Sequence, residues 1–391
     1  MGAAEALCDV GGVLVRAIRW HARRDVRLCE LPPPRVSSPD DVLLRVLYCG
    51  ICGTDLEEYR AGPRAVPRVP HPLTGRCAPI TLGHEFAGEV VAVGPAVRGF
   101  AVGDLAAVEG NLYCGRCHWC EHSEWNLCAQ LAQYGLAADG GLAELAVVRE
   151  TTAVKLPADA DPRIGALAEP LSVAVRAARQ SGATEASRVA IIGAGPIGLL
   201  VVQVMRSRGV ASICVVEPMA DRRRLALAVG AHEVADPAAA DLVMLLASDG
   251  IGPDVVVECS GASGTAQAAV EAVRRGGRVT FTAPVERAAI GPAFQLGEKG
   301  ITSALSHCRD DYITALRLAL TGEVDPIRVV TDEVCLEEAV QRAFGERLHQ
   351  APVGKMLVTP TGDAPGRRTA SRSAGNLPEL GQEPDVFPSH Y

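Results

Sequence analysis

The sequence predicts an α/β protein with two domains, one irregular and mostly β, the other a doubly wound parallel sheet. Two changes of texture along the chain support this prediction. Residues 13–166 contain short apolar β runs separated by glycine and proline, which is typical of short strands joined by turns. Residues 167–309 alternate apolar, β-branched runs with helical stretches, which is typical of a parallel sheet covered by helices. A chain of 391 residues is long enough for both cores.

Strands are expected where apolar and β-branched residues cluster. In the first domain, after a loose extension at 1–12, these places are 13–20, 41–47, 88–93 and 142–148. In the second domain they are 189–192, 213–216, Leu242–Leu246, 255–259 and 278–282. Residues 310–360 are too few to fold alone, so we expect them to complete the first domain. The tail at 361–391 is rich in Gly, Pro, Ser and Arg without periodicity, which predicts disorder.

Three glycines separate the first strand of the second domain from the helix expected at 197–208, in a G-x-G-x-x-G spacing. The first glycine makes a tight turn, the second lets the backbone approach a pyrophosphate, and the third lets the helix pack on the strand. An acid ends the next strand about twenty residues further on, where it can bind ribose hydroxyls. A tight turn alone could use the same glycines, but strand, helix and acid in register predict a dinucleotide site. Its expected residues are Gly193, Gly195, Pro196, Ile197, Gly198 and Glu217.

Four cysteines, Cys114, Cys117, Cys120 and Cys128, follow a C-x2-C-x2-C-x7-C spacing. Four thiolates can close a tetrahedral shell around one zinc ion and leave no open position, which predicts a structural site. An iron–sulfur cluster also takes four thiolates, but a tight ordered loop inside a β domain favours zinc. A nucleic-acid-binding zinc ribbon is not expected, because the acidic and neutral residues around the quartet offer nothing to a phosphate backbone.

The composition excludes several classes of partner. A net charge of −8 gives no basic footprint for nucleic acid. No apolar run is long enough to span a bilayer and no charged-then-apolar leader opens the sequence, so no membrane partner is expected. Thirteen cysteines without a signal peptide favour a reducing compartment in which cysteine binds metal. We therefore expect a cytoplasmic protein.

Five motifs occur in an order and spacing that resemble one known family. They are CGICGTDLEEY, TLGHEFAGEVVAVG, the cysteine quartet, ALAEPLSVAV and VAIIGAGPIGLL. Together they resemble the zinc-dependent medium-chain alcohol and polyol dehydrogenases over about residues 15–360. The stretches EYRAGP and HPLTG are most similar to sorbitol and 2,3-butanediol dehydrogenases. The resemblance implies that the mostly β domain is a GroES-like catalytic domain and that the doubly wound domain is a Rossmann NAD-binding domain.

The resemblance also implies a second, catalytic zinc, with Cys52, His84 and Glu169 as its ligands. One thiolate and one carboxylate neutralise Zn²⁺, and three protein ligands leave a position open for water. Glu85 would be a near neighbour, able to bond to the metal's water or exchange with it. Asp55 would orient a ligand.

In the same motif the resemblance gives Thr54 the role of taking the substrate proton. Many relatives carry a histidine three residues later to pass the proton outward, whereas this chain has Glu57. Glu57 is either the terminal base of the relay or an ordinary exposed side chain, and both interpretations remain open. Cys49, in the same stretch, is expected to pack in the core.

The preference for NAD or NADP depends on the residues that follow the second strand of the doubly wound domain, expected at 213–216. The charge of Glu217 favours NAD, because it would repel the 2′-phosphate of NADP. Arg222, Arg223 and Arg224 point the other way, since arginine can bind that phosphate, although in the family an arginine at the position of Arg222 lies along the adenine. The arginines are equally compatible with a solvated helix start. We expect NAD, with NADP as the alternative.

The expected function is hydride transfer between NAD(H) and a secondary alcohol or ketone, with two zinc ions per chain. The resemblance suggests a vicinal diol, polyol or cyclitol as the small-molecule substrate. A threonine or simple-alcohol dehydrogenase remains open, as does a protein that binds NAD and zinc without turnover. A zinc-free reductase of the same fold would lack Cys52, His84 and the quartet. The resemblance implies a homotetramer, with a homodimer as the alternative.

Overall fold

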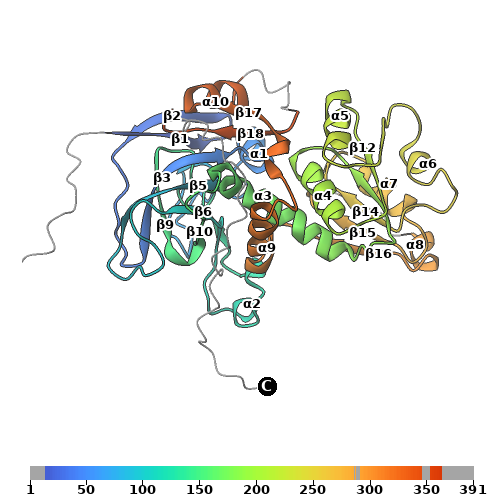
Figure 1. Cartoon of the computed structure of the whole chain (residues 1–391), viewed down its shortest axis with the longest axis horizontal. Helices are drawn as coiled ribbons and strands as arrows, with labels where there is room; N and C mark the ends of the chain where they lie inside the picture. The colour runs from blue at the N-terminus through green and yellow to red at the C-terminus, as the bar shows by residue number, and fades with distance from the viewer. Residues whose placement is uncertain (1–13, 286, 288–290, 346–352, 363–391) are drawn as a thin grey trace, which may run out of the picture.

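The computed structural model describes residues 14–285, 287, 291–345 and 353–362. Two lobes are built around separate sheets, and the long helix α3 (Pro162–Ser181) runs between them (Figure 1). The predicted loose extension at 1–12 and nearly all of the predicted disordered tail lie outside the described residues.

The N-terminal lobe contains a large mixed sheet with the strand order β10-β6-β5-β3-β18-β17, in which β9 also pairs with β3. A smaller sheet, β2-β1-β4, lies in the same lobe. Two strands from the end of the chain join the large sheet, since β18 pairs antiparallel with β3 through Leu357 and Gly50. The strands are β1 (Val15–Ala22), β2 (Asp25–Leu31), β3 (Asp41–Gly50), β4 (Ile80–Thr81), β5 (Glu85–Val93), β6 (Leu105–Val108), β9 (Leu145–Arg149), β10 (Ala153–Lys155), β17 (Val330–Val334) and β18 (Lys355–Val358).

The second lobe is a six-stranded, all-parallel sheet with the order β13-β12-β11-β14-β15-β16. Its apolar strands are buried because helices cover both faces, as in doubly wound proteins. The order reverses between β11 and β14, which is where such sheets bind ligands. The elements are β11 (Arg188–Ile192), α4 (Pro196–Ser207), β12 (Ser212–Val216), α5 (Ala220–Ala228), β13 (Glu233–Ala235), α6 (Leu242–Leu246), β14 (Val255–Glu258), α7 (Thr265–Ala272), β15 (Arg278–Phe281), α8 (Pro292–Leu296) and β16 (Gly300–Ser303).

One predicted strand is wrong, because Leu242–Leu246 forms the short helix α6. The side chain of Asp241 caps this helix by accepting backbone N–H bonds from its first turn. Leu242 and Leu246, four residues apart, pack against the same apolar cluster, whereas Met244 between them is 65% exposed. That spacing is helical rather than alternating. The parallel sheet instead contains β13 and β16, two short strands that were not predicted from the sequence.

Helix α3 contacts the strands β3, β5 and β6 of the first lobe and β14, β15 and β16 of the second. The predicted domain boundary between residues 166 and 167 falls inside this helix, so that division stays a prediction. Helix α9 (Arg309–Leu320) packs along α3. The remaining α-helices and strands of the described residues are α1 (Gly53–Ala61), β7 (Asn111–Leu112), α2 (His118–Glu121), β8 (Ala132–Gln133) and α10 (Leu336–Ala343).

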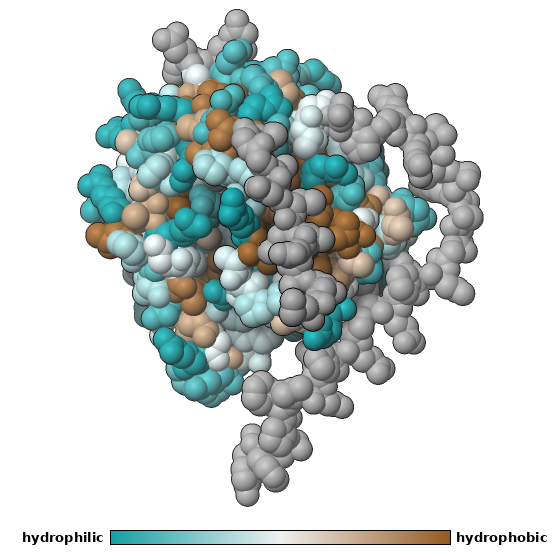
Figure 2. Space-filling model, turned by 90° about the vertical axis from the view of Figure 1, so that its left-hand side faces the viewer, coloured by the Kyte–Doolittle hydropathy of each residue, from teal (hydrophilic) through white to brown (hydrophobic). Residues whose placement is uncertain are grey.

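On the face of the N-terminal lobe that Figure 2 shows, hydrophilic and hydrophobic residues are intermixed. Within the described part of the chain, no helix combines the length and the hydropathy that crossing a membrane requires.

Candidate active site

Three potential metal ligands meet in the N-terminal lobe. Cys52 is the N-cap of α1, Glu85 is the first residue of β5, and His84 immediately precedes that strand. One ligand atom from each, a sulfur, a ring nitrogen and a carboxylate oxygen, lies within 4.8 Å of the other two. Sulfur, imidazole and carboxylate are the ligand types that zinc takes in proteins.

The groups around buried His84 favour a positive charge on its imidazole. Asp55 is fully buried; its Oδ2 accepts the backbone N–H of Cys52 at 2.9 Å and its Oδ1 lies 3.8 Å from His84 Nδ1. Among the described residues, neither that oxygen nor that nitrogen has a hydrogen-bond partner. Burial lowers the pKa of His84, but Cys52 and Asp55 outweigh it and raise the pKa well above its ordinary value. Surroundings that drive a histidine toward its cationic form also suit a bound metal cation, so these residues fit zinc.

Glu85 forms an ion pair with Lys355, a residue that was not predicted to lie in the site. The ammonium of Lys355, in β18, donates to the two carboxylate oxygens at 2.7 and 2.8 Å and to the Ile51 carbonyl at 3.2 Å. Both charged side chains are buried. Burial lowers the pKa of Lys355, but Glu85 and Cys52 raise it above its ordinary value. The only sequence signal was a lysine at the start of an apolar strand, KMLV.

Glu169 is buried in α3 beside this cluster, immediately before Pro170. The described group of ligand atoms within 4.8 Å does not include its carboxylate, whose Oε1 lies 3.5 Å from Nδ1 of His307. Burial raises the pKa of Glu169 to about 7, and the charge of His84 works against that rise. The structure therefore brings Cys52, His84 and Glu85 together and places Glu169 as their neighbour.

The first turns of α1 carry the two residues implied in proton transfer. Thr54 is exposed, and its Oγ1 lies 3.7 Å from the Cys52 sulfur. Glu57 is 51% exposed, and its carboxylate lies 3.8 Å from Arg60 and 3.9 Å from Arg64. Cys49, in contrast, lies fully buried in the apolar core, and burial raises the pKa of its thiol well above the ordinary value.

The predicted quartet converges in a small projection of the N-terminal lobe. Sulfur–sulfur distances are 3.5 Å for Cys117–Cys120, 3.9 Å for Cys117–Cys128 and 4.0 Å for Cys114–Cys120. Tetrahedral corners around zinc would be about 3.8 Å apart, since Zn–S bonds are about 2.3 Å long. Backbone amides of Cys114 and Gln130 donate to the sulfur of Cys128 at 3.3 and 3.4 Å. The quartet fits a four-thiolate zinc site.

The three glycines after β11 each meet a different physical need. Gly193 has a φ of 94°, and a Cβ on Gly198 would lie 2.0 Å from the carbonyl oxygen of Gly193. A Cβ on Gly195 would meet nothing within 4 Å, because the N-terminus of α4, which begins at Pro196 and Ile197, faces open space there. A helix N-terminus with open space in front of it fits a pyrophosphate.

Glu217 follows β12 and is 3% exposed. Its two carboxylate oxygens accept the backbone N–H groups of Ala194 and Met219 at 2.8 and 2.9 Å. Arg223 pairs with Asp236 at 3.0 Å and donates to the Glu217 carbonyl. The other two arginines also have partners: Arg224 pairs with Asp221, and Arg222 donates to the Val353 carbonyl at 3.1 Å.

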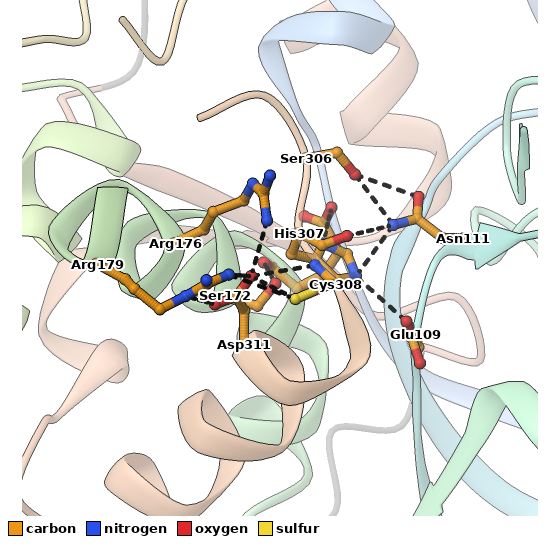
Figure 3. Close-up of polar contacts among 10 residues, drawn as sticks. Glu109, Asn111, Ser172, Arg176, Arg179, Ser306, His307, Cys308 and Asp311 are labelled. Atoms are coloured by element: carbon orange, nitrogen blue, oxygen red, sulfur yellow. Dashed lines mark hydrogen bonds and ion pairs between the residues drawn. The ribbon is translucent and has the colours of Figure 1, made fainter. Parts of the chain in front are cut away.

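A buried polar cluster beside Glu169 joins the two lobes (Figure 3). At its centre, His307 places Nε2 at 3.4 Å from Asn111 Nδ2 and 3.9 Å from Glu109 Oε1. Burial lowers the pKa of His307 to about 3, so its imidazole is neutral. Arg309 pairs with Glu109 at 2.6 Å. No sequence motif predicts this cluster, because its members are separated by up to about two hundred residues along the chain.

Comparison with known proteins decides the family. Residues 38–158 match the family Alcohol dehydrogenase GroES-like domain, and residues 196–321 match Zinc-binding dehydrogenase. The (R,R)-butanediol dehydrogenase of Bacillus subtilis (strain 168) is 34% identical over 351 residues, which cover 88% of this chain and 100% of that protein. The chain belongs to the zinc-dependent medium-chain alcohol dehydrogenase family.

Two further similarities span nearly the same length of this dehydrogenase. The L-threonine 3-dehydrogenase of Pyrococcus furiosus is 38% identical over 354 residues, 88% of this chain and 98% of that protein. The crystal structure of a zinc-binding dehydrogenase from Sinorhizobium meliloti 1021 bound to NADP matches with a TM-score of 0.81 at 33% identity, covering 89% of this chain and 99% of that one.

Family membership confirms the predicted GroES-like and Rossmann-type architecture and the predicted enzyme class. The dehydrogenase is a zinc-containing oxidoreductase that interconverts alcohols and ketones and uses a nicotinamide dinucleotide.

Proposed function

We propose that this dehydrogenase reversibly oxidises a small vicinal diol, polyol or cyclitol to a ketone, with NAD⁺ as the hydride acceptor. The observation that carries the proposal is the cluster of half-buried Cys52 with buried His84 and Glu85, beside which Glu169 is also buried. The 34% identity to a butanediol dehydrogenase over 88% of the chain supports a substrate with neighbouring hydroxyl groups.

We assign the catalytic zinc to Cys52, His84 and Glu169, and the second, structural zinc to the quartet. Charge supports Glu169 rather than Glu85 as the permanent ligand, because Lys355 already neutralises Glu85. A thiolate and a carboxylate neutralise the metal, and the fourth position stays open. When bound there, zinc would lower the pKa of a substrate hydroxyl toward about 7 and polarise the carbonyl of the product.

The residues of α1 carry the proton away. Thr54 is exposed beside Cys52, so its hydroxyl can accept the proton of a substrate hydroxyl and release its own. Glu57 lies three residues further along the same helix, a spacing at which side chains are neighbours. We propose that Glu57 receives the proton at the surface. Its alternative, an ordinary exposed side chain, predicts no effect of its charge on the pH–rate profile.

NAD rather than NADP is supported by the charges at the end of β12. The carboxylate of Glu217 is fixed by two backbone amides, so its negative charge cannot swing away from a 2′-phosphate. Arg223 and Arg224 are each paired with an aspartate, which reduces their attraction for a phosphate. Arg222 is the residue that we expect along the adenine.

The quaternary structure that we propose is a homotetramer, or a homodimer as the alternative. The edge strand β16 supports self-association, because Ile301 on it and Leu296 and Leu305 near it are exposed by 38%, 73% and 68%. Apolar side chains at the edge of a sheet are typical of contacts between chains. The measured molar mass of the purified protein in solution tests this.

The deciding experiment is an initial-rate assay of NADH or NADPH formation. It sets NAD⁺ and NADP⁺ against vicinal diols, polyols, cyclitols, L-threonine and primary alcohols. We expect turnover with diols or polyols and NAD⁺, abolished when zinc is removed and restored when it is returned. L-Threonine is the main rival substrate, because the Pyrococcus furiosus relative is an L-threonine 3-dehydrogenase. If L-threonine proved the best substrate, the proposed substrate class would be wrong. No turnover from a protein that holds two zinc ions and binds NAD would point to a specialised substrate outside this panel and would overturn the proposed substrate class.

A further inference from the structure

The loop between β16 and α9 places one imidazole against a proposed metal ligand. His307 is fully buried, and its Nδ1 lies 3.5 Å from Oε1 of Glu169. Among the described residues, this nitrogen has no hydrogen-bond partner, so Glu169 is the acceptor available to it. Glu169 lies within α3 and His307 in the loop before α9, 138 positions further along the chain, so only the fold brings them into contact.

The two ring nitrogens of His307 face different partners. The amide nitrogen of Asn111 donates to the backbone carbonyl of His307 at 3.1 Å and to Oγ of Ser306 at 3.0 Å, and it lies 3.4 Å from Nε2 of the ring. The nearest carboxylate oxygen is 3.9 Å from Nε2, on Glu109, but 3.5 Å from Nδ1, on Glu169. A hydrogen on Nδ1 therefore faces the nearer carboxylate, that of Glu169.

The loop that carries His307 is held from both sides (Figure 3). Asp311 accepts the backbone N–H of Cys308 at 3.1 Å and the Nε of Arg179, in α3, at 2.9 Å. Arg309 pairs with Glu109 of the N-terminal lobe at 2.6 Å. With its neighbours fixed to both lobes, the imidazole has little freedom to leave Glu169.

We propose that His307 is a positioning residue whose Nδ1–H orients the Glu169 carboxylate for the catalytic metal. The inference rests on the proposed role of Glu169 as a ligand. A hydrogen bond to one carboxylate oxygen leaves the other oxygen for the metal and limits rotation of the side chain. Asn111 acts one step further out, because its amide donates to the backbone carbonyl of His307 and holds that residue in place.

The test compares two polar substitutions in the full-length, zinc-loaded enzyme. In His307→Asn, the amide nitrogen can occupy the place of Nδ1, whereas in His307→Gln the amide reaches only the place of Nε2. Zinc release is followed against a colorimetric chelator. For the catalytic zinc we expect about 10–100-fold weaker retention in His307→Gln and near-wild-type retention in His307→Asn. The quartet's zinc should be unchanged in both and serves as the internal control.

A second readout uses the cobalt-substituted enzyme, whose visible absorption bands report the ligand geometry. We expect the bands of the catalytic site to change in His307→Gln and to return in His307→Asn. Equal behaviour of the two variants, in retention and spectrum, would overturn the proposal.

Glu169→Ala separates this proposal from the one on which it rests. If Glu169→Ala loses the catalytic zinc but His307→Gln keeps it, only the role of His307 fails. If Glu169→Ala keeps it with wild-type affinity, Glu169 is no ligand, and the assignment under the proposed function fails as well. Thermal melts of all three variants establish that each is folded.

Discussion

Lys355→Met is the substitution whose effect the structure defines most sharply. It removes the ammonium that bonds to both oxygens of Glu85 and to the Ile51 carbonyl, at a place where the lysine is 2% exposed. Methionine fills a similar volume, so the change leaves a buried carboxylate without its partner and creates little empty space. Removing one member of a buried ion pair costs about 3–5 kcal/mol, because the remaining charge stays desolvated.

Unfolding in urea, followed by tryptophan fluorescence, measures this loss of stability in the N-terminal lobe, where Lys355 and Glu85 lie. All three tryptophans, Trp20, Trp119 and Trp125, lie in the N-terminal lobe, so the signal reports the unfolding of that lobe. With an m-value of about 2 kcal/mol/M, a loss of about 3–5 kcal/mol lowers the urea midpoint by roughly 1.5–2.5 M. The zinc-loaded enzyme is used throughout.

Lys155→Met is the matched control. Lys155 also pairs with an acid, Asp104, at 2.7 Å, but its side chain is 53% exposed, and exposed pairs contribute only about 0–1 kcal/mol. The double variant with Lys355→Met and Glu85→Gln removes the uncompensated charge and should recover at least half of the lost stability. A loss below about 1 kcal/mol in Lys355→Met, or no recovery in the double variant, would refute the reasoning.

Four further outcomes follow from the site. Cys117→Ser should lower the zinc content from two ions per chain to one, and a content that stays at two would contradict the quartet. Glu217→Gln should lower the ratio of kcat/KM for NAD⁺ over NADP⁺ by about tenfold, or about 1.4 kcal/mol, and an unchanged ratio would leave the preference to other groups. Glu57→Gln should change the pH–rate profile of kcat/KM if the carboxylate relays the proton; an unchanged profile would favour the exposed-side-chain interpretation. Burial acts to raise the pKa of Asp311, but hydrogen bonds from Arg179 and Cys308 lower it below 3.8, so its contribution to stability is present above that pH and lost as the pH falls through the folded-state value. The stability difference between wild type and Asp311→Asn, from urea titrations, should therefore be constant from pH 7 to 5 and shrink below about pH 4, and a difference that persists there would contradict the assigned pKa.

Features encoded within one short stretch of sequence could be predicted without the structure. The quartet fits within one loop, so the spacing of Cys114 to Cys128 already limits what the four sulfurs can do together. The glycines after β11 were also readable, because positive φ at Gly193 and the contact of Gly198 with the turn are local requirements. Most strands of the parallel sheet followed from their apolar runs.

Features that depend on distant contacts could not be predicted. Lys355 and Glu85 meet only because β18 joins a sheet formed mostly by the first half of the chain. His307 reaches Glu169 only because a loop of the second lobe crosses to α3. The wrong prediction of a strand at Leu242–Leu246 has another cause. A five-residue apolar run is compatible with a strand or a helix, and here the side chain of Asp241 caps the run and stabilises the helix.

The buried charges of the active site divide into those that the protein compensates and those that it does not. The ammonium of Lys355 neutralises the carboxylate of Glu85. It donates to both carboxylate oxygens and to the carbonyl oxygen of Ile51. A neutral His307 beside Glu169 can donate a hydrogen bond but supplies no positive charge. Among the three proposed ligands, the carboxylate of Glu169 and a thiolate of Cys52 then supply two negative charges, which is the number that one zinc ion neutralises. Burial raises the pKa of the neighbouring Asp55 and so disfavours a third negative charge. A substitution that gave either group a permanent cationic partner, such as His307→Lys, should therefore weaken zinc retention at this site while leaving the quartet's zinc in place, and unchanged retention would show that charge does not select the ligands.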